Sequence, residues 1–127
     1  GAEKVVEYDL TAAACSIPFI SALGFHARQK QKKVKIHVRV DTSCGGPGIM
    51  PGDFGQLAKK IKEMSWLEVE GIFTHLFAAY TLDGKNVAAQ LNTFNEVLAE
   101  ARRLALKIPL VHAASSPAIF NYPDSHY

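Results

Sequence analysis

Three polar segments, each directly after an apolar run, carry side chains that could bind or transform a small molecule. The first covers residues 39–48, in which Arg39 and Asp41 lead into a glycine-rich loop. The second is Thr74-His75, and the third covers residues 112–117. Guanidinium, imidazole and hydroxyl groups bind anions and hold protons. The first question is therefore which of these segments could hold a phosphate.

Ser115-Ser116-Pro117 is the better candidate for a phosphate site. Serine before proline marks a helix start, where a hydroxyl and free backbone N–H groups favour an anion, and no acidic side chain lies in the first turn. An ordinary N-cap has the same local pattern, so both interpretations stay open. The loop at residues 43–48 lacks the Gly-Lys-Ser/Thr ending of a P-loop and by itself indicates a turn.

His75 and His112 are each predicted to close a strand. A lone histidine in such a place is commonly a hydrogen-bonded structural residue, but two on neighbouring strands favour a shared site. Neither has Cys, Asp or Glu at metal-ligand spacing, so no metal site is expected. The chain also has no legible Ser-His-Asp or Cys-His order and no G-x-S-x-G motif.

These segments are expected at strand ends, because strand-like and helix-like patterns alternate along the chain. Strands are predicted at residues 5–9, 34–40, 67–75 and 109–113. Helices are predicted between them, with Ser16 as an N-cap, Asp53 opening the second and Asn86 near the start of the third, after an Asp83-Gly84 turn. The residues predicted on the apolar helix faces are Phe19, Ile20, Leu23 and Ala27; Phe54, Leu57, Ile61 and Met64; and Val87, Leu91, Phe94, Leu98, Ala101 and Ala105.

The fold class predicted is α/β, with parallel βα units forming part of a TIM-type (β/α)8 barrel. A small open sheet is the alternative. The barrel is favoured because the apolar residues of the 34–40 strand alternate with Lys35, His37, Arg39 and Asp41. One face would then pack on helices, and the polar face would line a ligand-bearing interior. In such a fold the site lies at the carboxyl ends of the strands, and the first strand end, near Thr11, offers little chemistry.

Composition narrows the class of protein further. With 127 residues, 48% hydrophobic and 20% charged, the chain has enough residues for one core. The net charge of +2 gives no reason to expect nucleic acid, and the lysines at 30, 32, 33 and 35 are predicted to be a solvated helix end.

No apolar run is long enough to span a membrane. Cys15 and Cys44 form no C-x-x-C pair, which favours reduced thiols and a cytoplasmic location. The chain starts without Met, so we expect a piece of a longer protein.

Four segments together resemble the N-terminal barrel of alanine racemases, which are pyridoxal-phosphate enzymes built from a barrel and a C-terminal β domain. The matching segments are "VEYDLTAAACS", "VKIHVRVDTSCGGPGI", "LEVEGIFTHLFAAY" and "VHAASSPAIFNYPDSHY". They stand in the order and at the spacing of the family, and they cover nearly the whole chain. The resemblance implies pyridoxal 5'-phosphate as cofactor and a small amino acid as substrate.

The resemblance also implies roles for individual residues. Ser116 matches the serine that binds the cofactor phosphate, and Ser115 stands where the family usually has asparagine. His75 matches the histidine beside the pyridine ring. His112 matches a second histidine in the hydrogen-bond network behind that ring.

Two positions depart from the family pattern. Arg39 stands at the place of a lysine that is often carbamylated, and Gly46 at the place of the arginine which that carbamate holds against the phenolic oxygen of the cofactor. Arginine forms no carbamate and glycine has no side chain, so this pair cannot exist here. The guanidinium of Arg39, held by Asp41, could take over the contact, or Arg39 could pair with an acidic group away from the cofactor. Leu76-Phe77 and Tyr80 also differ from the usual family residues.

The family's cofactor-binding lysine lies upstream of the matched part, and its tyrosine base and β domain lie downstream. Residues 1–127 are therefore expected to be a partial barrel domain of about four βα units that holds cofactor contacts but no catalytic base. The full-length form would interconvert L- and D-alanine as a homodimer and supply D-alanine for the cell wall, while this chain alone would be inactive. The alternatives are a drifted barrel that binds the cofactor without racemase activity and a non-functional half-barrel fragment.

Overall fold

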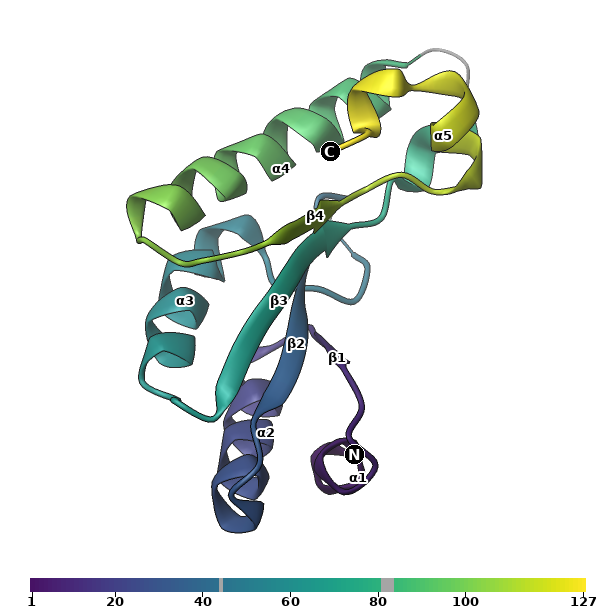
Figure 1. Cartoon of the computed structure of the whole chain (residues 1–127). Helices are drawn as coiled ribbons and strands as arrows, with labels where there is room; N and C mark the ends of the chain where they lie inside the picture. The colour runs from purple at the N-terminus through teal and green to yellow at the C-terminus, as the bar shows by residue number, and fades with distance from the viewer. Residues whose placement is uncertain (44, 81–83) are drawn as a thin grey trace.

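Four parallel strands in one sheet organise the chain (Figure 1). The sheet order follows the sequence, so each strand pairs with the next one along the chain. The computed structural model describes residues 1–43, 45–80 and 84–127. The strands are β1 (Ala12–Ala14), β2 (Val34–Val40), β3 (Leu67–Thr74) and β4 (Leu110–His112).

Helices α2 (Ile17–Lys30), α3 (Phe54–Lys62) and α4 (Lys85–Arg103) connect the strands and follow one another along one side of the curved sheet (Figure 1). Right-handed crossovers between parallel neighbours place successive helices on the same side of a sheet. The other α-helices are α1 (Ala2–Glu7) and α5 (Ser116–Asn121). Short 3-10 turns are η1 (Pro51–Asp53), η2 (Phe77–Tyr80) and η3 (Pro123–Ser125).

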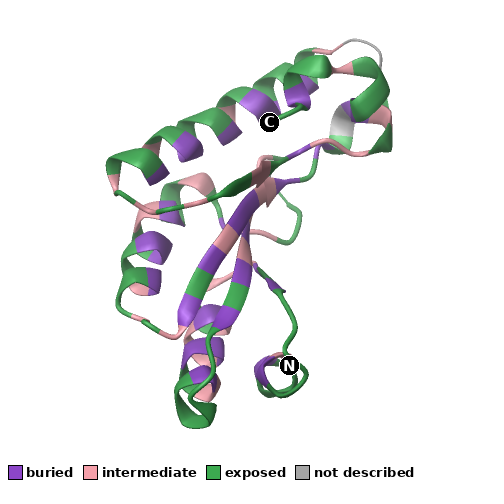
Figure 2. Cartoon of the chain, viewed as in Figure 1, coloured by how far each residue is buried: buried purple, intermediate pink, exposed green. Residues whose placement is uncertain are grey.

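The alternation predicted for the second strand is present in β2. Its four valine and isoleucine positions are at most 4% exposed, whereas Lys35 is exposed and His37 and Arg39 are half-buried. Figure 2 shows the same alternation along the ribbon. The apolar face packs under the helices, and the polar face is left for the site.

The first predicted strand is wrong. Residues 2–7 form α1, whose Ala2 and Val6 lie four positions apart and are both buried, as on one helix face. The first strand is β1 instead, three alanines whose poor β-propensity gives no signal in the sequence. The strand end predicted near Thr11 consequently lies at Ala14, where Cys15 follows with a free thiol.

The predicted helices are present with small differences at their ends. Ser16 caps α2 by accepting a hydrogen bond from the backbone N–H of Phe19 at 3.4 Å. The third predicted helix, α4, ends at Arg103, so Ala105 lies beyond the helix instead of on its apolar face. Ala105 is exposed and has φ of 50°, which stops the helix. Of the predicted Asp83-Gly84 turn, Gly84 has φ of 65° and Asp83 lies outside the described residues, as does Cys44.

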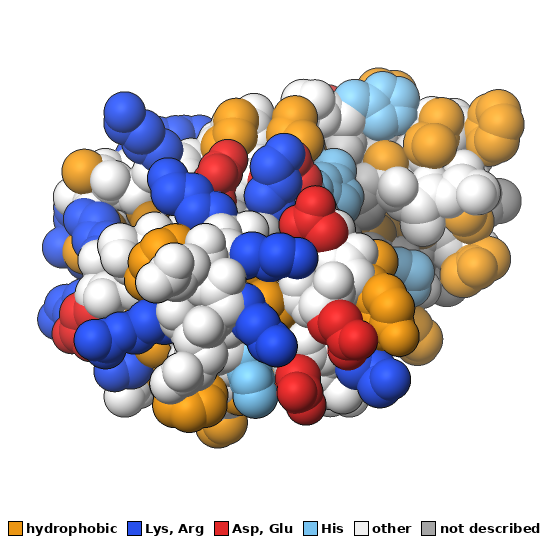
Figure 3. Space-filling view, turned by 60° about the horizontal axis from the view of Figure 1, so that its bottom comes forward, with side chains coloured by type: hydrophobic (Ala, Val, Ile, Leu, Met, Phe, Trp, Pro, Cys, Tyr) orange, Lys and Arg blue, Asp and Glu red, His pale blue; other side chains and the backbone are white. Residues whose placement is uncertain are grey.

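Charged side chains are distributed without a basic stripe on the face shown in Figure 3, where acidic and basic groups are interspersed. The lysines at 30, 32 and 33 are exposed at the end of α2, as predicted. Lys35 differs, since its ammonium lies 2.7 Å from the Glu70 carboxylate. Within the described ranges, every helix is too short or too polar to cross a bilayer.

Candidate functional site

Side chains from three neighbouring strands meet on the polar face of the sheet near its carboxyl end. Arg39, Phe73 and His112 are register partners across β2, β3 and β4, so they form one row. A pocket of about 240 Å³ opens beside this row. Four of the five residues predicted for the cofactor site line it: Arg39, His75, His112 and Ser115.

Phe73, the middle residue of the row, contacts the side chains on both sides of it. The His112 ring stacks on the Phe73 ring with a centroid distance of 4.8 Å and an interplanar angle of 4°. The Arg39 guanidinium carbon lies 5.8 Å from the centroid of the same ring, a cation–π distance. Arg39 makes no ion pair with any residue the structure describes.

The expectation that Asp41 holds Arg39 is wrong, because the Asp41 carboxylate is used by its own loop. It accepts hydrogen bonds from the backbone N–H groups of Ser43, Gly45 and Gly46 at 2.9, 2.8 and 3.1 Å and from the Ser43 hydroxyl at 3.1 Å. Burial alone would raise the pKa of Asp41, but these four bonds outweigh it and lower the pKa below 3.8. Asp41 is therefore the anchor of the loop.

The three glycines of the loop differ in whether the backbone requires glycine at their positions. A Cβ on Gly48 would lie 2.7 Å from the Asp41 backbone nitrogen, so the chain can pass β2 only with glycine there. Gly45 has φ of 154°. A Cβ on Gly46, in contrast, would meet only ordinary contacts at 3.7 and 3.8 Å. Gly46 is thus not demanded by the backbone, and a side chain at this position would fit.

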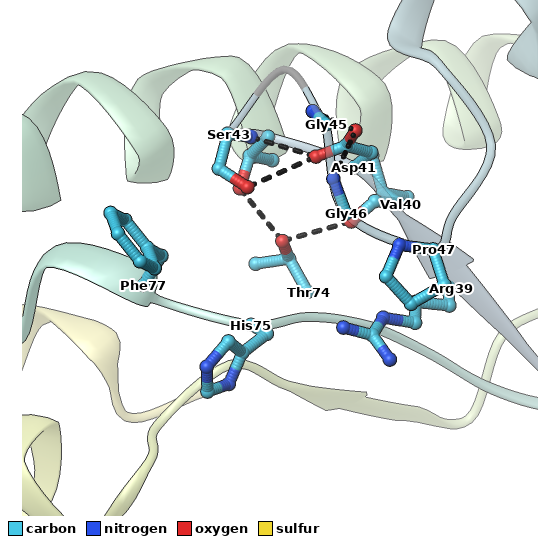
Figure 4. Close-up of a pocket in the computed structure, with 11 residues that line it drawn as sticks. Arg39, Val40, Asp41, Ser43, Gly45, Gly46, Pro47, Thr74, His75 and Phe77 are labelled. Carbon is cyan, nitrogen blue, oxygen red and sulfur yellow. Dashed lines mark hydrogen bonds between the residues drawn. The ribbon is translucent and has the colours of Figure 1, made fainter.

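A second pocket, of about 310 Å³, lies between the loop and the end of β3 (Figure 4). Figure 4 shows the Arg39 guanidinium and the His75 ring extending from neighbouring strands on the same side of the loop. His75 is exposed and lines both pockets. It is placed to contact a ligand that bridges them.

A polar clamp fixes the strand ends behind the second pocket. The Thr74 hydroxyl donates to the Val40 carbonyl at 3.0 Å and lies 2.7 Å from the Thr42 hydroxyl. Gln90 of α4, only 6% exposed, donates to Thr42 Oγ1 and to the His75 carbonyl at 3.1 and 3.2 Å. Gln90 was not singled out from the sequence, although it stands three residues after Val87 on the predicted apolar stripe, where a polar residue needs partners.

The two serines differ in exposure. Ser115 caps α5 through its backbone, and its hydroxyl is buried with no hydrogen-bond partner among the described residues. Ser116 is exposed at the first position of α5. A buried hydroxyl without a partner is costly, so Ser115 is a place where an additional polar group would fit. Ser115 is the N-cap residue of α5, but its side chain makes no capping hydrogen bond.

Glu70 and His37 were not predicted as site residues, yet His37 contacts His112 of the row, and Glu70 contacts His37. His37 Nδ1 lies 2.9 Å from His112 Nε2, and His37 Nε2 lies 3.2 Å from Glu70 Oε2. A signal for them exists in the sequence. The apolar alternation of β3 changes phase between Val69 and Ile72, which indicates an irregularity at Glu70. No cluster of three or more metal-ligating side chains occurs in the described part of the chain.

Parallel strands in sequence order with a polar site at their carboxyl ends are typical of part of a (β/α)8 barrel enzyme. The chain belongs to the family of alanine racemase N-terminal domains, since the family described as "Alanine racemase, N-terminal domain" matches residues 1–127. The resemblance drawn from the sequence motifs is confirmed.

Two relatives illustrate the match. The chain is 33% identical over 124 residues to the alanine racemase of Methanococcus maripaludis, covering 97% of the chain and 33% of that protein. It is 36% identical over 121 residues to alanine racemase 2 of Caldanaerobacter subterraneus, covering 93% of the chain and 31% of the relative. The chain thus spans about a third of the length of these curated relatives.

Solved structures agree on the fold. The alanine racemase of Streptomyces coelicolor A3(2) superposes with a TM-score of 0.91 at 28% identity, covering 98% of this chain and 34% of that one. The alanine racemase of Clostridium difficile 630 gives 0.90 at 22% identity, covering 99% and 33%. The predicted fold class, parallel βα units of a TIM-type barrel, is confirmed.

Proposed function

We propose that this chain contributes the phosphate side and one ring side of a pyridoxal 5'-phosphate site in an amino-acid racemase of the alanine racemase family. The observation that carries the proposal is the single pocket lined by Arg39, His75, His112 and Ser115. These four residues lie in sequence motifs spread from residue 39 to residue 115, and the fold brings them together. Family membership supports the same assignment.

The phosphate is proposed to bind at Ser116 with help from Ser115. Ser116 is exposed and matches the phosphate-binding serine of the family, and the buried Ser115 hydroxyl lacks a partner within the described residues. The first N–H groups of α5 are not used within the helix and can add donors. Because α5 has only six residues, these direct contacts and not the helix dipole carry the argument.

The pyridine ring is proposed to lie between His75 and Arg39. Arg39 retains one cation where the family has a carbamate and arginine pair, and it has no carboxylate partner among the described residues. An anionic phenolic oxygen would supply that partner. His112, stacked on Phe73, supports this side of the site without reaching the reacting atoms.

The substrate is proposed to be alanine, interconverted between its L and D forms to provide D-alanine for the cell wall. Pyridoxal phosphate, when bound, draws electrons from the α-carbon and makes its hydrogen removable as a proton. The family's two bases lie outside the matched segment, so activity is assigned to a longer protein with a β domain. We further propose a cytoplasmic homodimer, as the family resemblance implies.

The test is racemisation of L-alanine by the longer protein that contains this chain, measured against added pyridoxal phosphate. Ser116→Ala should raise the cofactor concentration for half-maximal activity by about 10- to 100-fold, the range of one hydrogen bond to a charged group. Ser115→Ala should raise it less, and Ser65→Ala, an exposed serine between α3 and β3, should leave it unchanged. Equal effects in all three variants would refute the phosphate assignment.

A second candidate is a barrel that binds the cofactor without racemising amino acids. The replacement of both family residues at Arg39 and Gly46 favours it, because the usual contact to the phenolic oxygen is lost. The same assay separates the two. Saturable cofactor binding without interconversion of alanine would support this second function and exclude the first.

A further inference from the structure

A hydrogen-bonded chain of ionisable side chains runs along the polar face of the sheet and ends at His112. Lys35 Nζ lies 2.7 Å from Glu70 Oε1, and Glu70 Oε2 lies 3.2 Å from His37 Nε2. His37 Nδ1 in turn lies 2.9 Å from His112 Nε2. Four groups from three strands are therefore connected by hydrogen bonds.

Two backbone features make this hydrogen-bonded chain possible. The register between β2 and β3 shifts between Ile36 and His37, so that Glu70 is an extra residue in β3 and its carboxylate is directed to the polar face. Gly71 then leaves room for the imidazole, since a Cβ there would lie 2.6 Å from the His37 ring. The bulge and the glycine together allow the His37 ring to lie between Glu70 and His112.

Charge decides the direction of the hydrogen bonds. Hydrogen bonds from Lys35 and His37 lower the pKa of Glu70 below 4.5, so its carboxylate is ionised at neutral pH and can only accept. His37 must then carry a proton on Nε2. In neutral His37 the Nδ1 atom is an acceptor, which requires that His112 donate from Nε2 and keep Nδ1 unprotonated.

One added proton reverses this arrangement at His112. Protonated His37 carries a hydrogen on Nδ1 as well and donates it to His112 Nε2. His112 then has to hold its own proton on Nδ1. Partial burial, followed by the neighbouring charge of His37, lowers the pKa of His112 below 6.5, which favours the neutral His112 ring.

We propose that Glu70 and His37 are positioning residues that set the tautomer of His112, and that protonation of His37 converts His112 Nδ1 from a hydrogen-bond acceptor into a donor. His112 lines the pocket with Arg39 and His75, so the change alters what the pocket offers to a ligand. Its importance for catalysis rests on the proposed function, but the tautomer itself does not. β1 adds no charge, since Ala13 is the register partner of His37. The charged and titratable groups around His37 are Lys35, Arg39, Glu70 and His112.

The test is imidazole nitrogen NMR on the chain labelled with 15N-histidine, without cofactor, over a pH range above 4.5. His37→Gln and His112→Gln assign the resonances among the five histidines. At the upper end of the range both rings should carry their proton on Nε2. As His37 takes up its proton, the protonated nitrogen of His112 should change to Nδ1.

Glu70→Gln supplies the decisive comparison. It removes the charge of the carboxylate that accepts from His37 Nε2 and should shift the tautomer change of His112 to lower pH. Glu68→Gln removes an exposed carboxylate on the same strand, one that is not hydrogen-bonded to His37 in the described structure; it is the matched control and should leave the transition in place. In folded His37→Gln, His112 should lose its pH-dependent change of tautomer.

Two results would overturn the proposal. One is a His112 ring that keeps its proton on the same nitrogen while His37 titrates. The other is an identical transition in Glu70→Gln and Glu68→Gln. Neither result depends on pyridoxal phosphate. Failure of the cofactor assignment and failure of the proposed control of the His112 tautomer are therefore separate outcomes.

Discussion

Asp41 stabilises the loop beside the pocket through four hydrogen bonds to one buried carboxylate. Bonds to a charged acceptor are stronger than neutral ones, and three of the four donors are backbone N–H groups that have no other described partner. Asp41, which the sequence suggested as the partner of Arg39, therefore forms part of the wall of the site. Arg39 is left available to an external anion.

Asp41→Ala should lower the free energy of unfolding by on the order of 3 kcal/mol at pH 7, because the N–H groups of the loop lose a charged acceptor. The folded-state pKa of Asp41 is lowered, so its contribution is complete above about pH 3.8 and is lost as the pH falls through the folded value. Urea unfolding at pH 7 and pH 3 measures both effects. Asp53→Ala, an exposed aspartate without a cap hydrogen bond, is the control and should change stability by less than about 0.5 kcal/mol.

Gly46 and Gly48 make opposite predictions within the same loop. Gly46→Arg should be accepted with a change of about 0.5 kcal/mol or less, since the space around its Cβ is open. Gly48→Ala should cost about 1–3 kcal/mol, because its Cβ would press on the backbone of Val40 and Asp41. Equal losses in urea unfolding would contradict the geometry described for this loop.

At the scale of elements, α4 fixes the ends of β2 and β3 through one buried side chain. Gln90 donates hydrogen bonds to Thr42 and to the His75 carbonyl. It therefore positions two residues that line the pocket of about 310 Å³. The apolar face of α4 packs beside it, with Val87, Leu91 and Phe94 buried. The site is thus supported by a helix that lines neither of its two pockets.

Gln90→Leu should destabilise the chain by about 1–3 kcal/mol, since it leaves Thr42 and the His75 carbonyl without this donor. Gln56→Leu, at an exposed position of α3, should have little effect. Urea unfolding measures the loss, and amide hydrogen exchange at the ends of β2 and β3 should rise in the first variant alone. Similar behaviour of the two variants would mean that Gln90 does not hold the strand ends.

Elements with strong periodicity were predictable, and weakly marked ones were not. The alternating β2 and the apolar stripe of α4 follow from hydrophobic periods of 2 and 3.6 residues. β1 consists of three alanines with little preference for strands, so only its neighbours in the sheet define it. For the site, strand ends placed His75 and His112 correctly. The contact of His112 with His37 required the bulge at Glu70, which depends on pairing between strands.

At the scale of the whole molecule, the sheet has two outer strands without a second neighbour among the described residues, β1 and β4. β4 also exposes a large apolar side chain, since Leu110 is 50% exposed on the outermost strand. Unpaired strand edges and exposed apolar groups favour association. In the proposed longer protein these surfaces would be covered by the remaining barrel strands.

The isolated chain should therefore associate as its concentration rises, as measured by sedimentation velocity. Leu110→Lys should reduce association by placing a charge at the open edge. Phe25→Lys, which replaces a 60% exposed apolar residue on α2, is the control and should associate like the unmodified chain. A monomeric chain at all concentrations would show that the edges are closed in solution.

The central claim, that these residues form the phosphate side of a pyridoxal phosphate site, is tested most directly by NMR titration of the chain with pyridoxine 5'-phosphate. This compound lacks the aldehyde and so does not react with surface lysines. The account predicts saturable shifts at Ser115, Ser116 and His75, roughly tenfold weaker binding in Ser116→Ala, and no comparable shifts with pyridoxine, which has no phosphate. Equal shifts with both compounds, or undiminished binding in Ser116→Ala, would contradict it.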